Sequence, residues 1–168
     1  MHIRHATAED CDGLLQIRNH YVSESFAVFD EMPLLPDSIA RWIASFSTTG
    51  PYQLLVATDG PGIQGFASSQ RYREHTAFRR TVETSIYIAP GKSGRGVATA
   101  LYRSLFSTLE AEDLHRAVVG IALPNEASVN LHKKFGFTEV GVFNEYAFKH
   151  GKYISSIWLQ RQLGRNAA

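Results

Sequence analysis

Residues 86–102 read IYIAPGKSGRGVATALY. The β-branched and aromatic residues 86–88 predict a strand, and the glycines that follow predict a tight loop. Val97, Leu101 and Leu105 then recur at helical spacing. Glycines expose backbone N–H groups, and a helix N-terminus adds the positive end of its dipole. The stretch therefore predicts a strand–loop–helix unit that binds phosphate groups of a ligand.

Two well-known phosphate-binding patterns fail here on spacing. A P-loop ending at residues 91–93, GKS, requires a glycine at position 86, which is Ile86 inside the strand. A dinucleotide fingerprint beginning at Gly94 and Gly96 requires a small residue at position 99, which is Thr99. Neither ATP nor NAD is therefore the expected ligand.

A third pattern matches better. Residues 93–98, SGRGVA, resemble the pyrophosphate loop R/Q-x-x-G-x-G/A of GNAT superfamily N-acetyltransferases at both small positions. They depart from it at Ser93, which stands in place of Arg or Gln, and Lys92 and Arg95 offer positive charge instead. The resemblance implies that acetyl-CoA is the ligand. Its expected contacts in this loop are Gly94, Arg95, Gly96, Val97, Ala98 and Thr99.

A second stretch, NEASVNLHKKFGF at residues 125–137, is similar to the GNAT segment N-x-x-S/A-x-x-L/F/M-Y/H-x-x-x-G-F/Y. Asn125 is a good helix N-cap, and Gly136 is a plausible left-handed stop. The resemblance implies that Asn125 and Ser128 contact the cofactor. A cap alone is the alternative for Asn125, and the two roles are compatible.

The resemblance then narrows to phosphinothricin acetyltransferase-type enzymes and runs from about Ile3 to Leu163. It is carried by residues 3–7, 19–21, 29–31, 81–88 and 148–152. It implies an α+β GNAT fold, with a mixed central sheet of about seven strands and about four flanking helices. It also implies a homodimer, and the length of 168 residues predicts one domain, 1–168.

Hydrophobic periodicity and turn residues predict the elements in outline. Strands are expected at residues 2–6, 52–58, 63–69, 81–88, 116–123, 138–146 and 152–161. Helices are expected from Thr7 toward Ser23, from Pro36, over 96–111 and from Asn125.

Composition narrows the partners. A net charge of +1 gives no bulk attraction to nucleic acid or to an anionic membrane. The single Cys11 cannot form an internal disulfide, and the first residues lack a secretory hydrophobic segment, so a cytoplasmic location is expected. The histidines show no metal-ligand spacing, so no metal is expected.

Acetyl transfer to an amine requires a base, and Glu83 is the candidate. It lies in the apolar strand 81–88, on the same face as Ser85 and Tyr87. The pattern alone favours a solvated carboxylate on an open strand face, and it is the family resemblance that implies the base. Partial desolvation against Phe78 and Tyr87 is expected to raise the pKa of Glu83.

His132 occupies the position where many GNAT enzymes carry a tyrosine general acid, and phosphinothricin-type members carry histidine. The resemblance implies that it protonates the departing thiolate or helps activate the amine. Packing beside Phe135 as a structural histidine is the alternative. The resemblance also implies that the backbone of Ile86, Tyr87 and Ile88 aligns the pantetheine and polarises the thioester oxygen.

A basic cluster at residues 71–80 reads by itself as a solvated loop. In the resembling family this loop meets a carboxylate-bearing amino acid, which suits an arginine. The substrate-binding residues implied are Arg73, Glu74, His75, Phe78 and Thr84. His75, Thr76 and Phe78 depart from the commoner Arg, Pro and Tyr of that loop.

The resemblance thus implies transfer of acetyl from acetyl-CoA to the α-amine of a small, acidic, amino-acid-like compound. The alternatives are acetylation of another amine, such as a peptide N-terminus or a polyamine, and a non-catalytic acyl-CoA-binding regulator. Keeping both Glu83 and His132 speaks against the regulator.

Overall fold

The computed structural model describes residues 1–60 and 62–164. The strands are β1 (His2–His5), β2 (Leu54–Asp59), β3 (Gly62–Arg71), β4 (Thr81–Ile88), β5 (Arg116–Ala122), β6 (Thr138–Lys149) and β7 (Lys152–Gln162). The helices are α1 (Cys11–Glu24), α2 (Pro36–Ala44), α3 (Val97–Leu109) and α4 (Glu126–Lys134), with short 3-10 turns at Ala8–Asp10 and Thr76–Phe78. The predicted order of strands and helices is confirmed.

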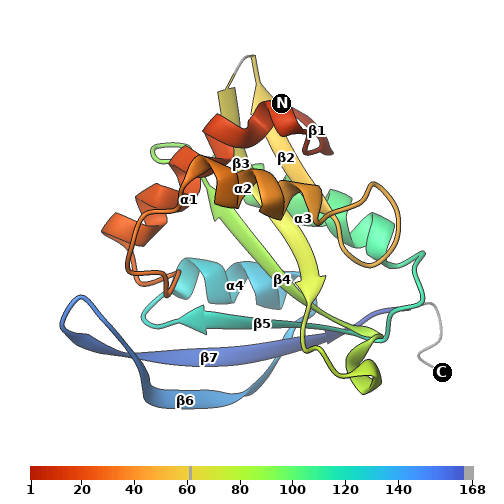
Figure 1. The fold of residues 1–168 in the computed structure, drawn as a ribbon. Coiled ribbons are helices and arrows are strands. Elements are labelled where there is room, and N and C mark those ends of the chain that lie inside the picture. Colours follow the sequence, from red (N-terminus) through yellow and green to blue (C-terminus); the bar gives the residue numbers. More distant parts are fainter. Residues whose placement is uncertain (61, 165–168) are drawn as a thin grey trace.

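The strands form one mixed seven-stranded sheet, as predicted, and their order in it is β1-β2-β3-β4-β5-β7-β6 (Figure 1). Neighbouring strands are antiparallel, except that β4 and β5 run parallel. This parallel pair places the ends of β4 and β5 at the same edge of the molecule, where the loops toward α3 and α4 begin.

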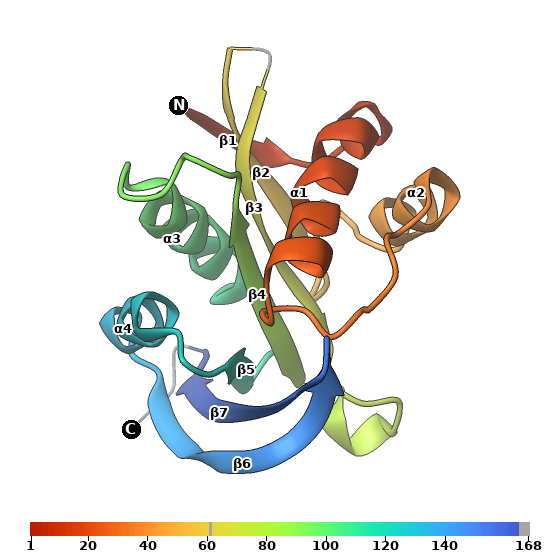
Figure 2. The ribbon, with the colours of Figure 1, turned by 90° about the vertical axis from the view of Figure 1, so that its left-hand side faces the viewer.

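Helices cover both faces of the sheet (Figure 2). On one face α1 and α2 bury Leu14, Ile17 and Ile39 against Val56 and Phe66. On the other face α3 supplies the apolar stripe predicted from its sequence period, including Leu101 and Leu105. The two cores hold β4 from both sides, so its position is rigidly defined.

Most elements differ from the prediction by one to three residues at an end, and two of these differences have a clear local reason. Strand β2 begins at Leu54 and not at Tyr52, because the Gln53 N–H donates to the Ser69 side chain at 3.0 Å. Helix α1 is preceded by a separate 3-10 turn, where the Asp10 carboxylate accepts the Thr7 N–H at 2.8 Å.

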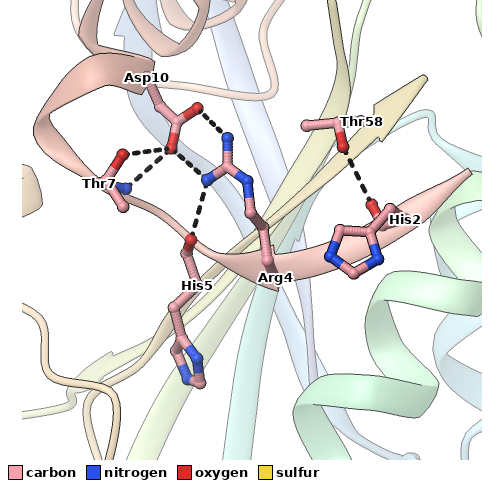
Figure 3. Close-up of polar contacts among 6 residues, drawn as sticks. All are labelled: His2, Arg4, His5, Thr7, Asp10 and Thr58. Carbon is pink, nitrogen blue, oxygen red and sulfur yellow. Dashed lines mark hydrogen bonds and ion pairs between the residues drawn. The ribbon is translucent and has the colours of Figure 1, made fainter. Parts of the chain in front are cut away.

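Asp10 also anchors β1 to the start of α1 (Figure 3). Both of its oxygens accept from the Arg4 guanidinium at 2.7 Å, although Asp10 is only 6% exposed. Burial by itself raises the pKa of Asp10, but the hydrogen bonds from Arg4 and Thr7 outweigh it and lower that pKa. The charged pair therefore stabilises this junction at neutral pH.

Candidate active site

Strands β4 and β5 separate along their length. They pair only from Thr81 opposite Arg116 to Glu83 opposite Val118. Beyond that point β4 stays paired with β3 as far as Ile88, and β5 stays paired with β7 as far as Ala122. Figure 1 shows the two arrows close together at one end and apart at the other. The facing edges of the two strands therefore form an opening in the middle of the sheet.

The register shows which backbone groups face this opening. The Ala89 N–H donates to the Gln64 carbonyl of β3 at 2.9 Å. Because hydrogen bonding alternates along an antiparallel pair, positions 83, 85 and 87 bond to β3, and positions 84, 86 and 88 face the other side. The Ile88 carbonyl accepts the Tyr21 hydroxyl at 2.9 Å. The N–H and C=O groups of Ile86 are left facing the opening.

A cavity of about 730 Å³ occupies the opening. It brings together most of the predicted catalytic and cofactor residues: Glu83, His132, Ile86, Tyr87, Ile88, Gly94, Gly96, Val97, Ala98, Thr99, Asn125 and Ser128. Residues far apart in the sequence thus line one cavity. The backbone of Tyr87 bonds to β3 and does not face the opening, where its predicted role would place it.

The glycine loop presents an exposed backbone to the cavity. Gly94 and Gly96 both have φ of +77°, a conformation that favours glycine, and no atom lies within 4 Å of a Cβ built on either. Gly96 is the N-cap of α3, so the first N–H groups of that helix lie at the cavity. The loop fits a pyrophosphate group. Of its predicted contacts, Arg95 is the exception, because it is exposed and does not line the cavity.

Helix α4 begins at the same cavity. The Asn125 side chain accepts the Ser128 N–H at 3.1 Å, which is the predicted N-cap. Asn125 and Ser128 both line the cavity as well. The two roles left open for Asn125 are therefore geometrically compatible.

Glu83 lies at the point where β4 and β5 begin to separate. Burial raises its pKa, and the charge of Arg73 partly offsets this rise. Tyr87, one of the two aromatic neighbours predicted, lines the cavity with Glu83. Phe78 does not, and packs instead against Tyr72 with ring centroids 5.4 Å apart.

His132 is 1% exposed and both of its ring nitrogens are engaged. Nδ1 lies 2.7 Å from the Ser128 carbonyl, which can only accept, so Nδ1 carries the proton. Nε2 lies 2.7 Å from the Tyr102 hydroxyl and accepts from it. Burial lowers the pKa of His132, although the bond to Ser128 partly opposes this. The ring is therefore neutral. It packs edge-on against the rings of Tyr102 and Phe137.

Most of the predicted substrate residues lie outside the cavity. Arg73, Glu74, His75 and Phe78 are exposed in the segment between β3 and β4 and do not line it. Arg71 donates to Glu74 at 3.0 Å on this surface. Only Thr84 lines the cavity; it is 2% exposed, and its hydroxyl has no hydrogen-bond partner among residues 1–60 and 62–164.

One wall of the cavity comes from a segment to which the sequence analysis assigned no role. The residues between α1 and α2 line it with Val28, Phe29 and Asp30, and α1 adds Arg18 and Tyr21. Burial raises the pKa of Tyr87 to about 12; Arg18 lowers it, while Tyr21, Asp30 and Glu83 raise it further. All of these groups thus act electrostatically on one tyrosine. The stretch Phe29–Glu31 carried part of the family resemblance, which was the available signal.

Lys149 holds that segment in place. Its side chain is fully buried, and Nζ donates to the carbonyls of Ser25 at 2.8 Å and Val28 at 2.9 Å. Ser25 is the C-cap of α1, and an ammonium there also complements the helix dipole. Lys149 therefore joins the end of β6 to the wall of the cavity.

Comparison with known proteins agrees with this architecture. The sequence model of the acetyltransferase (GNAT) domain family matches residues 3–158. The chain is 46% identical over 163 residues to the phosphinothricin N-acetyltransferase of Streptomyces coelicolor, covering 96% of this chain and 95% of that protein. It is 31% identical to the L-methionine sulfoximine/L-methionine sulfone acetyltransferase of Salmonella typhimurium, covering 100% and 98%.

A solved structure is similar throughout. The GNAT superfamily phosphinothricin acetyltransferase of Sinorhizobium meliloti, in complex with acetyl-CoA, aligns with a TM-score of 0.92 at 28% identity, covering 99% of this chain and 90% of that one. In the part of the chain that the structure describes, no helix is long and apolar enough to cross a membrane. The family match spans most of the chain and agrees with the opened sheet and the glycine loop, and the chain belongs to the GNAT acetyltransferase family.

Proposed function

We propose that this protein transfers the acetyl group of acetyl-CoA to the α-amine of a small amino-acid-like acceptor. The observation that carries the proposal is the opening between β4 and β5, with the N-termini of α3 and α4 at its cavity. The opening offers the unpaired edges of β4 and β5 and two sets of helix N–H groups. A molecule with amide groups at one end and a pyrophosphate at the other can pair its amides with a strand edge and bind its pyrophosphate to the helix N-termini.

Acetyl-CoA is such a molecule. The loop from Gly94 to Thr99 would hold its pyrophosphate, and the open edge at Ile86 and Ile88 would pair with the amides of its pantetheine arm. An N–H group of β4 would also stabilise negative charge that develops on the thioester oxygen. Asn125 and Ser128 would contact the same arm from α4. The Sinorhizobium meliloti relative, whose structure is a complex with acetyl-CoA, supports the choice of this cofactor.

Glu83 would act as the general base. An α-ammonium must lose a proton before its nitrogen can attack the thioester carbon, and Glu83 takes that proton directly or through a water. Its raised pKa brings its basicity closer to that needed near neutral pH. When the new amide forms and the thioester C–S bond breaks, CoA departs as a thiolate.

His132 would protonate the departing thiolate once its ring carries a second proton. Both burial and the bond from Tyr102 to Nε2 oppose that protonation. The role therefore requires a minor protonation state of the ring. A thiol with an ordinary pKa of about 8.5 is stable enough as a thiolate to leave without a proton donor. The reaction therefore depends only weakly on proton donation by His132.

The acceptor class follows from the relatives, which acetylate phosphinothricin and methionine sulfoximine or sulfone by name. These compounds carry an α-amine, a carboxylate and a second oxygen-rich group. We propose that at least one of phosphinothricin, methionine sulfone and methionine sulfoximine is acetylated by this protein.

The test is release of free CoA thiol on mixing the enzyme and acetyl-CoA with each of the three compounds, with mass spectrometry of the product. We expect a product heavier by one acetyl group for at least one of them. Acetylation of a peptide N-terminus or a polyamine alone would refute this acceptor class and retain the acetyltransferase. Acetyl-CoA binding without any turnover would favour a regulator.

We also propose a homodimer that works in the cytoplasm, where acetyl-CoA is available. Exposed apolar side chains on β6, among them Val140, Val142 and Phe143, support a subunit contact there. Light scattering should give twice the chain mass of 18.7 kDa. A monomer at micromolar concentration would refute the dimer, and recovery of the protein outside the cytosolic fraction of its native cells would refute the location.

A further inference from the structure

Arg18 of α1 donates no hydrogen bond to any residue within 1–60 and 62–164. Its side chain is 21% exposed and lines the cavity. Nε is buried with no hydrogen-bond partner among the described residues. Nη2 lies 3.6 Å from Asp30 Oδ2, which is longer than a hydrogen bond.

Two other partly buried arginines behave differently. Arg4 makes two bonds of 2.7 Å to Asp10, and Arg161 makes one of 2.6 Å to Glu110. An arginine that loses water normally regains hydrogen bonds, because an unpaired buried donor is costly. Arg18 therefore has unused hydrogen-bond donors, and a ligand oxygen in the cavity could accept from them.

The guanidinium is also held in position before any ligand binds. Its carbon lies 4.8 Å from the centroid of the Trp42 ring, a cation–π contact that favours this position of the guanidinium. Asp30 is 46% exposed and weakly paired, so an incoming anion can displace it at little cost. The preorganised fork of an arginine matches two oxygens of a carboxylate or phosphinate.

We propose that Arg18 binds an oxyanion of the acceptor, its α-carboxylate or its side-chain phosphinate, and so selects acidic amino-acid-like substrates. This inference rests on the proposed function. It replaces Arg73 as the principal anion-binding residue, because Arg73 is exposed, lies over the Tyr72 ring at 4.9 Å and does not line the cavity. Arg18 is a binding residue here and takes no part in proton transfer.

The test compares an acid with its own carboxamide and adds an acceptor that carries a phosphinate. Steady-state kinetics at saturating acetyl-CoA are measured with methionine sulfone, with its uncharged carboxamide and with phosphinothricin. The variants are Arg18→Met, Arg18→Lys and Arg73→Met. The matched control is Arg41→Met, since Arg41 is an exposed arginine of α2 outside the cavity. Thermal melting of each variant verifies the fold.

If Arg18 binds the α-carboxylate, Arg18→Met raises KM for both acids by about 10- to 150-fold and leaves KM for the carboxamide and for acetyl-CoA within about threefold. If it binds the phosphinate, only KM for phosphinothricin rises. Either result supports the proposal, and Arg18→Lys should recover part of the loss. Arg41→Met should match the wild type.

An equal rise in KM for acid and carboxamide, or no rise at all, would overturn the proposal. The proposal would also be overturned if Arg73→Met lost the preference for the acids over the carboxamide while Arg18→Met kept it. Should the wild type acetylate none of the three, the acceptor class fails separately. Calorimetric binding of methionine sulfone to the CoA-bound wild type and Arg18→Met then decides the role of Arg18: equal affinity, or no binding to either, overturns it.

Discussion

The Tyr102 hydroxyl donates a hydrogen bond of 2.7 Å to Nε2 of His132, and this bond links α3 to α4 beneath the cavity. Tyr102 is fully buried, and burial raises its pKa far above the ordinary value, so it remains a donor at every working pH. A hydrogen bond donated to an imidazole favours the neutral ring. The two helices whose N-termini lie at the cavity are thus joined through a neutral histidine.

Replacing Tyr102 with Phe should therefore raise the pKa of His132. The variant loses the bond that favours the unprotonated Nε2, and it should be less stable by about 1 kcal/mol. If the protonated ring donates to the thiolate, the alkaline limb of the kcat profile moves to higher pH. Histidine NMR titration and the pH profile measure both effects. An unchanged His132 titration would contradict the hydrogen-bond argument.

Glu83→Gln should lower kcat by about 10²- to 10⁴-fold, because the amide keeps the shape and loses the base. KM for acetyl-CoA should hardly change. In the wild type, kcat/KM should rise with pH through the raised pKa of Glu83, and this limb should vanish in the variant. Near wild-type turnover with the same profile would remove Glu83 from the mechanism.

The same variant should keep or gain stability at neutral pH. A carboxyl whose pKa is raised by burial favours the protonated folded state, so stability declines as pH rises from the unfolded pKa through the folded pKa. Glutamine is never ionised and does not incur this cost. At pH 7.5 the melting temperature of Glu83→Gln should therefore equal or exceed that of the wild type. Such a result shows that the loss of activity is not a loss of folding.

Two glycines of the same loop separate backbone strain from ligand contact. Gly91 and Gly96 have φ of +73° and +77°, so alanine strains either by about 1 kcal/mol. Gly96 lines the cavity and Gly91 does not. We expect Gly96→Ala to weaken acetyl-CoA binding at least tenfold in calorimetry, and Gly91→Ala to leave it within about twofold. Equal losses would mean that the loop binds through its conformation alone.

Lys149→Met should raise KM for the amine acceptor more than KM for acetyl-CoA. Its ammonium holds the carbonyls of Ser25 and Val28, next to the wall of the cavity, and methionine cannot donate to them. Lys152→Met, an exposed change at the start of β7, is the control. Equal increases in both KM values would show a general loss of structure instead of a positioning role.

The local structure of the phosphate-binding unit follows from the sequence. The bounds of strand 81–88 were predicted correctly, and so were the left-handed Gly136, the Asn125 cap and the alternation that places Glu83 with Tyr87. Such features depend on neighbouring residues and backbone sterics, which a short stretch contains. The predictions of the mixed sheet and of acetyl-CoA as the cofactor came from the family resemblance.

Only the tertiary structure decided which side chains meet in the cavity. The separation of β4 from β5 depends on which strands pair, and pairing is set by packing across the whole sheet. Arg18 enters the site because α1 crosses that sheet, and Lys149 because the distant end of β6 contacts the end of α1. The polar groups around His132 come from two helices whose approach is fixed by buried apolar contacts. Contacts of this kind carry no local sequence signal, because their partners are chosen by burial and not by spacing along the chain.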